Sequence, residues 1–286
     1  MNVMLLPNII IPKLANECLE FYSPDTLADC DSRRHFKNYP HDVNYKFNSR
    51  GFRDQEWPDD LENAIWCLGD SATTGIGAPI EHSWPSQLSK ITGIPTINLG
   101  IRAIDNYTIS TIAREIIVNV QPKNMLILWA YLERRPLDKI HNVIIDYSQQ
   151  QVAVNDYSEH YDFFKKCILN ITEVNIKTNI VHSLQYDIVY DQSLINDIWN
   201  SVRDPSWPKT LEDMDTLDPG IVDELHTKHK VYDQLTKMLN WFKFKREFIK
   251  NEISKVDRVD LARDGFHWDI ETNKSIANKF KDLLVL

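Results

Sequence analysis

Short apolar runs alternate with longer amphipathic segments from about residue 64 onward. The short runs are bounded by polar or turn residues, which is typical of strands buried on both faces. The longer segments repeat apolar residues at helical spacing and carry capping residues, such as Asp105 at one start and Gly93 after one end. Such a series predicts a mostly parallel sheet with right-handed crossovers. We expect strands at 64–68, 96–99 and 125–129, and helices at 83–92 and 105–119.

The rest of the chain carries weaker signals. Tyr45 and Phe47 alternate with polar residues ahead of a turn at 49–51, which predicts a short strand and a hairpin. Segment 204–219 is acidic and contains prolines, so we interpret it as a surface loop or insertion of the kind that shapes binding sites. We further expect helices at 157–174, 193–202, 226–249 and 272–284, and strands at 143–145 and 178–184.

These patterns divide the chain into two regions. Residues 1–60 form an N-terminal extension with a lead-in hairpin, and residues 61–286 form an α/β domain. Insertions into that domain are expected around 131–160 and 185–225. With 43% hydrophobic and 26% charged residues, the composition is that of an ordinary globular protein.

Charge and hydropathy restrict the partners. The formal net charge is -9 and no long basic run occurs, so we expect no nucleic-acid partner. No stretch approaches the ~20 apolar residues that a spanning helix needs. Residues 1–12 lack a basic n-region and are interrupted by Pro7, so we expect no signal peptide and a cytoplasmic location. Their apolar patches suggest docking to another protein chain.

Metal and redox chemistry find little support in the sequence. The four cysteines include no CxxC pair, so we expect neither a zinc site nor a disulfide framework, and a reducing compartment is the simpler interpretation. His226 and His229 lack HExxH spacing, and no carboxylate completes a set of ligands, so we expect no bound metal.

The triplet Gly69-Asp70-Ser71 follows the first buried strand. A serine at the carboxyl end of such a strand lies where open α/β sheets bind ligands. We expect the next helix, at about 81–92, to direct its positive dipole toward this serine. The alternative is a simple strand-to-turn connection, in which Asp70 and Ser71 satisfy local backbone groups.

A serine nucleophile needs a base, and the base needs an orienting group. Asp264 and His267 are three residues apart, so one turn of backbone can bring carboxylate and imidazole into contact, with Gly265 allowing a tight loop. The alternative is a loop in which Asp264 caps a turn and His267 is merely exposed.

Three stretches together resemble the motifs of the SGNH, or GDSL, hydrolase family. They are Gly69-Asp70-Ser71, the lead-in Asn-Ser-Arg-Gly-Phe-Arg-Asp at 48–54, and Asp-Gly-Phe-His at 264–267. The resemblance covers about 44–130 and 255–284. It implies a three-layer α/β/α, flavodoxin-like fold with a mostly parallel sheet and no cofactor. It also implies a catalytic triad of Ser71 as nucleophile, His267 as base and Asp264 as orienting group.

The resemblance further implies an oxyanion hole built from the N–H groups of Ser71 and Gly100. The family usually has Gly-x-Asn-Asp after the third strand, but here Leu132 stands where the asparagine is expected. Losing one oxyanion donor typically costs about a hundred- to a thousandfold in rate. Tyr131 and Arg134 are the candidates to replace it or to contact substrate, and an arginine could also pair with an acidic sugar.

The resulting hypothesis is hydrolysis of a small acyl ester, with an acetyl group on a carbohydrate as the first candidate. Trp207 and Trp268 could form an apolar or sugar-stacking wall. Two alternatives remain open: a non-catalytic binding or structural module on the same fold, and an O-acyltransferase. The resemblance also allows a place in a virion or other assembly.

Overall fold

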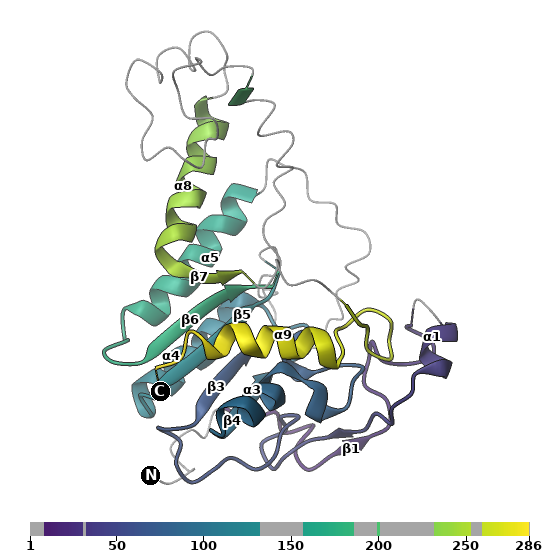
Figure 1. Ribbon diagram of the computed structural model, residues 1–286. Helices are drawn as coiled ribbons and strands as arrows, with labels where there is room; N and C mark the ends of the chain where they lie inside the picture. The colour runs from purple at the N-terminus through teal and green to yellow at the C-terminus, as the bar shows by residue number, and fades with distance from the viewer. Residues whose placement is uncertain are drawn as a thin grey trace.

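A parallel sheet lies at the centre of the computed structural model, between helices on both of its faces (Figure 1). The strand order is β4-β3-β5-β6-β7, so the first two strands of this sheet in the chain exchange places in it. This is the flavodoxin-like order, and it confirms the expected fold class. The strands are β3 (Ile65–Gly69), β4 (Thr96–Gly100), β5 (Asn124–Trp129), β6 (Asn179–Leu184) and β7 (Ile249–Glu252).

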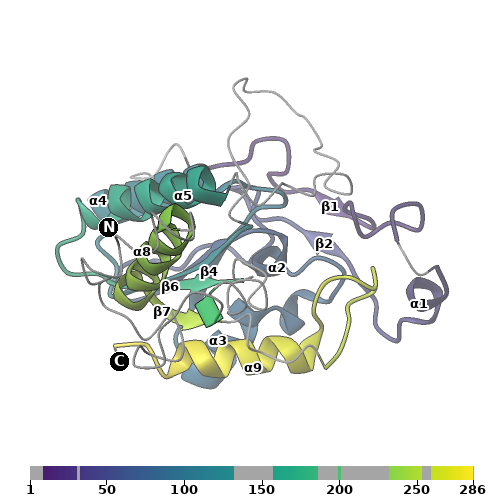
Figure 2. The ribbon, with the colours of Figure 1, turned by 90° about the horizontal axis from the view of Figure 1, so that it is seen from above.

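The helices form the two outer layers. Figure 2 places α4 and α5 on one side of the sheet and α3 and α9 on the other. Helix α8 packs with α5, on the first side. The structure describes residues 9–30, 33–131, 157–185, 199–200, 232–252 and 259–285. The helices are α3 (Trp84–Thr92), α4 (Asn106–Asn119), α5 (Tyr157–Thr172), α8 (Tyr232–Phe248) and α9 (Ile270–Lys281).

Alternation along β3 divides the core into two. Trp66 and Leu68 belong to the hydrophobic cluster under α4, α5 and α8, whereas Ile65 and Cys67 belong to the cluster under α3 and α9. Successive side chains of a strand point to opposite faces, so a run that is apolar throughout can be buried on both. Cys67 is fully buried, as its place in this run predicts.

The predicted capping residues also take their expected roles. Asp105 accepts a hydrogen bond from the Thr108 N–H at 2.9 Å and begins α4. Gly93 ends α3 in the left-handed conformation, as predicted, and Ser83 caps the start of that helix, a role that was not predicted. The boundaries of both helices therefore follow from local sequence.

Several elements differ from the prediction or were not foreseen. Strand β7 begins at the last residue of the helix predicted at 226–249, and no element was predicted for its other three residues. The predicted short strand near Tyr45 is present as β2 (Tyr45–Lys46), but it pairs with β1 (Cys18–Leu19) and not across the turn at 49–51. The short helix α1 (Arg33–Asn38) was not predicted. The predicted strand at 143–145 and loop at 204–219 lie outside the described residues, as does most of the predicted helix at 193–202.

The N-terminal extension packs on the main domain. Ile9, Phe52 and Trp57 belong to the same hydrophobic cluster as β3 and α4, and Ile11 packs against it. The Ile11 N–H also donates to the Arg50 carbonyl at 2.8 Å. Ile9 and Ile11 thus contact their own domain, and the docking of residues 1–12 to another chain stays a prediction.

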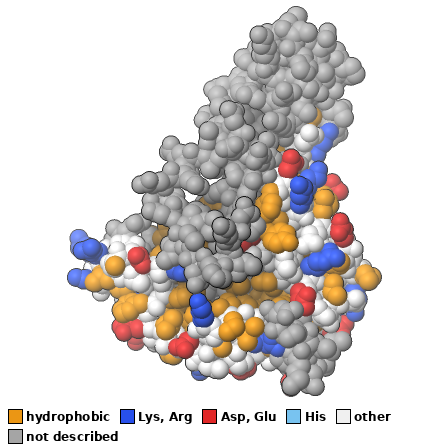
Figure 3. Space-filling view, turned by 180° about the vertical axis from the view of Figure 1, so that it is seen from behind, with side chains coloured by type: hydrophobic (Ala, Val, Ile, Leu, Met, Phe, Trp, Pro, Cys, Tyr) orange, Lys and Arg blue, Asp and Glu red, His pale blue; other side chains and the backbone are white. Residues whose placement is uncertain are grey.

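The described surface mixes apolar and charged side chains. Figure 3 shows hydrophobic side chains interspersed with charged ones on the described part of the face that it presents. Among the helices that the structure describes, none has both the length and the apolar character that crossing a bilayer requires. All four cysteines are free thiols.

Candidate active site

Ser71 lies at the carboxyl edge of the sheet, directly after β3. It is the first residue of a separate short helix, α2 (Ser71–Thr74), and Asp70 caps that helix by accepting the Ala72 N–H at 3.0 Å. The helix that follows the serine most directly is therefore α2, and not the predicted helix at 81–92, which is α3. Gly69 is required by close packing, since a Cβ there would lie 2.2 Å from Thr73 Oγ1.

The structure brings Ser71, His267 and Asp264 together. His267 Nε2 lies 2.8 Å from Ser71 Oγ, and His267 Nδ1 lies 2.5 Å from Asp264 Oδ2. The network is satisfied when Nδ1–H donates to the carboxylate and Nε2 accepts the serine O–H. This arrangement, in which all three side chains are buried, is that of a serine hydroxyl with a positioned and oriented base.

Asp264 is held as a carboxylate. Burial alone would favour its neutral form, but the His267 side chain and the N–H groups of His267 and Phe266 donate to it. These hydrogen bonds lower the pKa of Asp264 below its ordinary value. At neutral pH the carboxylate is therefore charged, and it can stabilise an imidazolium at His267.

Glycines allow the two halves of the site to approach each other. Gly77, with a φ of 77°, lies in the loop after α2, and a Cβ there would lie 3.0 Å from the Cβ of Ala262 and 3.1 Å from Asp264. The Gly77 carbonyl accepts the Arg263 N–H at 2.7 Å. Gly265, with a φ of 73°, turns the chain between Asp264 and His267, as the sequence predicted.

Arg53 of the lead-in stretch supports the same loop, a role that sequence reasoning did not assign. It is 1% exposed, and it donates to the carbonyls of Gly75, Ala78 and Asn44. Its guanidinium also lies 4.2 Å from the ring centre of Tyr45. Burial lowers the pKa of Arg53 to about 10, so it remains charged at neutral pH. The lead-in motif thus fixes the chain that follows the serine.

A buried ion pair fastens the N-terminal extension to the loop that carries Asp264. Arg263 Nη2 lies 2.7 Å from Oδ2 of the fully buried Asp25, and Tyr45 donates its hydroxyl to the same oxygen at 2.6 Å. The Cys30 thiol donates to the Asp264 carbonyl at 3.3 Å. The extension is therefore part of the scaffold of the site, although its sequence reads as irregular.

A buried glutamine completes the support on the sheet side. Gln185 follows β6, and with its amide nitrogen turned toward Asp70 it donates to both carboxylate oxygens at 3.1 Å. Asp70 is thereby held between the α2 backbone and Gln185. No signal in the sequence pointed to this residue, because only the neighbouring strands bring it to the edge.

The two predicted oxyanion donors differ in the structure. The Ser71 N–H is the first of α2, and the first N–H groups of a helix have no acceptor within the helix. The Gly100 N–H instead donates to Asn98 Oδ1 at 2.9 Å, and a Cβ at Gly100 would lie 2.2 Å from the Thr74 nitrogen. Close packing of α2 against β4 therefore accounts for this glycine, and its N–H is already used. In the loop after β4, Ala103 holds a φ of 56°, which is uncommon without glycine.

The predicted substrate contacts are only partly described. Tyr131 follows β5 at the same edge, and its carbonyl accepts the side-chain amide of Asn106 at 3.1 Å. Trp268 is 6% exposed and packs in the core cluster under α3 and α9, so packing accounts for it. The remaining residues lie outside the described part of the chain: Leu132, Arg134, Trp207, His226 and His229.

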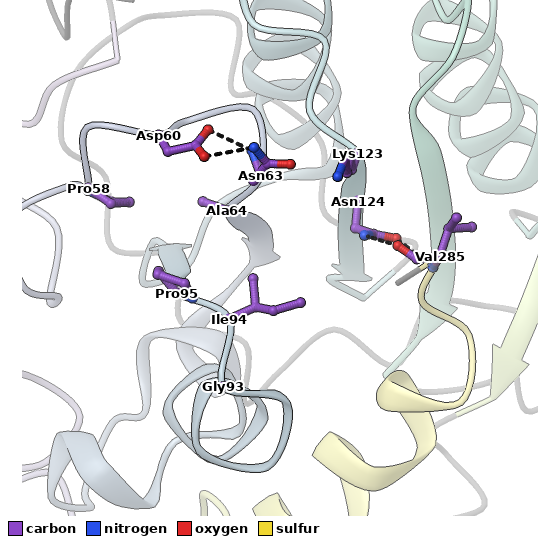
Figure 4. A pocket seen from close by; sticks show the side chains of 10 residues that line it. All are labelled: Pro58, Asp60, Asn63, Ala64, Gly93, Ile94, Pro95, Lys123, Asn124 and Val285. Carbon is purple, nitrogen blue, oxygen red and sulfur yellow. Dashed lines mark hydrogen bonds between the residues drawn. The ribbon is translucent and has the colours of Figure 1, made fainter.

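A hollow of about 300 Å³ lies at the opposite edge of the sheet (Figure 4). Ala64, Pro95 and Asn124 line it at the amino ends of the strands. Two pairs of its polar groups bond to each other: Asn63 donates to Asp60 at 2.7 Å, and Asn124 donates to the Val285 carbonyl at 2.8 Å. The length of β3 separates this hollow from Ser71, so it takes no part in the candidate site.

No protein-family model and no curated protein matches this chain. Among solved structures, it is similar to a protein described as a GDSL-like lipase from Bacteroides ovatus, with 12% identity and a TM-score of 0.41 over 80% of this chain. The chain spans about half, 54%, of that protein. It is also similar to a carbohydrate acetylesterase family member from Sinorhizobium meliloti (12% identity, TM-score 0.38, 77% of this chain and 96% of that one).

A third similar structure is a Clostridium thermocellum family 3 carbohydrate esterase (14% identity, TM-score 0.40, 77% of this chain and 94% of that one). TM-scores this low carry no weight for fold or activity. The fold class therefore rests on the strand order, and the site rests on the contacts of the chain's own residues.

Proposed function

We propose that this protein is a serine ester hydrolase of the SGNH type, which cleaves small acyl esters. The observation that carries the proposal is the continuous chain of contacts from Ser71 Oγ through His267 to Asp264, at the ligand-binding edge of a parallel sheet. The motif resemblance at Gly69-Asp70-Ser71 and at 264–267 supports the same reaction.

In the first half of the reaction, Ser71 Oγ attacks the ester carbonyl while its proton moves to His267 Nε2. The carboxylate of Asp264 holds Nδ1–H and stabilises the imidazolium that forms. His267 then returns the proton to the departing alcohol, which leaves an acyl group on Ser71. In the second half, water attacks this acyl-enzyme with His267 as base, and the acid is released.

The oxyanion of each tetrahedral intermediate needs hydrogen-bond donors. The N–H of Ser71, at the first position of α2, is the donor that we assign. As for the substrate, we propose an O-acetyl group on a carbohydrate, which rests on the family resemblance alone. The same triad also serves acyl transfer to a sugar when water is excluded.

The first experiment is hydrolysis of a small aryl acetate by the full chain, with Ser71→Ala and Ser110→Ala in parallel. Ser110 is a buried serine of α4 that lies outside the site, so its substitution controls for loss of a hydroxyl. Turnover that is lost in Ser71→Ala and kept in Ser110→Ala supports the proposal. Absence of turnover in the folded, unmutated protein, with acceptor sugars also tested, would overturn it in favour of a binding module.

A further inference from the structure

A second histidine–carboxylate pair joins the end of the loop that carries Asp264 and His267 to a distant segment of the chain. His82 Nδ1 lies 2.6 Å from Oδ1 of Asp269, two residues beyond His267. We call His267–Asp264 the inner pair and His82–Asp269 the outer pair. The inner pair is explained by Ser71, whereas nothing in the proposed reaction uses the outer pair.

A third potential ligand lies against the outer pair. The ring centres of His41 and His82 are 4.9 Å apart, with an edge-on orientation. One ligand atom from each of His41, His82 and Asp269 lies within 4.8 Å of the others. The three come from distant parts of the chain: the segment between α1 and β2, the short 3-10 helix η2 (Ile80–His82), and the residue before α9. Tertiary folding alone brings them together.

The spacing of these groups suits a tetrahedral cation. Zn²⁺ binds imidazole nitrogen and carboxylate oxygen at about 2.0–2.2 Å, and two imidazoles bound in this way have ring centres about 5 Å apart. The observed separation of 4.9 Å agrees with that value. Ligand atoms around such an ion lie about 3.4 Å apart. His82 Nδ1 and Asp269 Oδ1, now 2.6 Å apart, therefore separate to admit the ion, and His41 approaches them. His41 is exposed, so its side chain can rotate inward at little cost.

The hydroxyl of Tyr39 orients the carboxylate of Asp269. Tyr39 donates to Asp269 Oδ2 at 2.6 Å, which leaves Oδ1 facing His82. Asp269 occupies the N-cap position of α9, yet its side chain caps no helix N–H. One carboxylate oxygen therefore faces His82, and the other accepts from Tyr39. Hydrogen bonds of this kind orient the ligating carboxylate in many metal sites.

We propose that His41, His82 and Asp269 form a binding site for Zn²⁺, with water as the fourth ligand. Two imidazoles and one carboxylate make a set of the kind that holds zinc and disfavours Mg²⁺. The bound ion joins the N-terminal extension to the loop that bears the inner pair. Its role is structural, because Ser71 and His267 complete their contacts without it. The proposal does not depend on the proposed esterase activity.

The test is titration of the chelator-treated full chain with Zn²⁺ and, separately, with Mg²⁺, followed by calorimetry. We expect the wild type to bind one equivalent of Zn²⁺ that His41→Gln either loses or binds at least about tenfold more weakly. The matched control is His35→Gln, which removes a histidine of α1 that lies outside the cluster. This control should bind Zn²⁺ as the wild type does.

Thermal unfolding supplies an independent readout. Zn²⁺ should raise the Tm of the wild type and of His35→Gln, and leave that of His41→Gln unchanged, because a ligand stabilises only the state that binds it. His41 is exposed, so its substitution leaves the fold intact. Equal Zn²⁺ stoichiometry and affinity in His41→Gln and the wild type would overturn the proposal, as would equal binding of Mg²⁺.

Discussion

The inner and outer pairs join the same two chemical groups, and each takes its carboxylate from the segment just before α9, yet their surroundings differ. In the inner pair, both side chains are at most 6% exposed and the second imidazole nitrogen of His267 faces Ser71 Oγ. In the outer pair, His82 is 13% exposed and lies against the ring of His41. A histidine–carboxylate contact therefore does not define a function by itself. The group that meets the other side of the imidazole decides what the pair can do.

The largest expected effect separates the two pairs by activity. His267→Ala should lower kcat/KM for an aryl acetate by roughly 10⁴-fold or more, because the base is lost. His82→Ala removes an imidazole at a similar distance from its carboxylate but touches no reacting atom, so we expect a change of less than about tenfold. Steady-state kinetics of both variants measure this. Similar losses in the two would contradict the division of roles.

A second test replaces each carboxylate by its amide. Asp264→Asn keeps the shape of the inner pair but favours the wrong histidine tautomer, so we expect kcat to fall by about 10⁴-fold. Asp269→Asn alters only the outer pair, and kcat should remain within about tenfold of the wild type. The affinity for Zn²⁺ should show the opposite pattern, unchanged in Asp264→Asn and weakened in Asp269→Asn.

The scaffold of the inner pair can be tested through the buried Asp25–Arg263 contact. Asp25→Ala leaves the Arg263 guanidinium without its carboxylate and the Tyr45 hydroxyl without its acceptor. Breaking a buried pair in this way lowers the free energy of unfolding by about 3–5 kcal/mol. The control, Glu62→Gln, breaks an ion pair with Lys177 in which both side chains are half exposed, and it should cost less than about 1 kcal/mol. Urea denaturation compares the two.

The smallest effect concerns a buried carboxyl that has no histidine partner. Asp54 accepts the Asn98 N–H at 2.7 Å, but burial raises its pKa from 3.8 to about 7. The folded state therefore binds this proton more tightly than the unfolded state does, so the contribution of Asp54 to stability falls as pH rises from about 4 to about 7. An asparagine can still accept the N–H and does not ionise. In Asp54→Asn, the difference in Tm between pH 5 and pH 8 should shrink relative to the wild type.

Asp264 should behave in the opposite sense. Its pKa is lowered in the folded state, so its contribution to stability is present above the ordinary carboxyl pKa and is lost as pH falls through the lower, folded value. The two carboxyls thus act in separate pH windows. In Asp264→Asn, we expect the free energy of unfolding no longer to fall at acid pH through this group, while the change between pH 4 and 7 is retained. Measuring stability against pH in this variant checks that expectation. An unchanged acid limb would count against the inner pair as a charged contact.

Local sequence was sufficient for the elements that carry their own signal. The apolar runs at β3, β4 and β5 and the helix boundaries at Asp105 and Gly93 were predicted within a residue or two, because burial on both faces and helix capping depend on the segment itself. Strand β7 was missed for the complementary reason. It is an edge strand of polar composition, Ile-Lys-Asn-Glu, and only its pairing with β6 makes it a strand.

The candidate site divides in the same way. The spacing of Asp264 and His267 predicted their contact, because three residues form one turn. The contact of His267 with Ser71 joins residues 196 positions apart and was inferred from family-like motifs rather than from spacing. Gly100 illustrates the limit of that reasoning. Its position matches the family motif, but the packing of α2 explains the glycine and its N–H bonds to Asn98.

The sequence by itself therefore determined the layered α/β core, the strand that leads to Ser71 and the short loop that orients the base. Only the tertiary structure decided that the N-terminal extension supports that loop through Asp25 and the loop after α2 through Arg53. It also decided that His82 meets Asp269 beside His41. The physical reason is the distance along the chain over which each interaction acts. Periodicity, capping and turn chemistry act over a few residues, whereas buried ion pairs and clustered ligands arise from the topology that brings distant segments to one edge of the sheet.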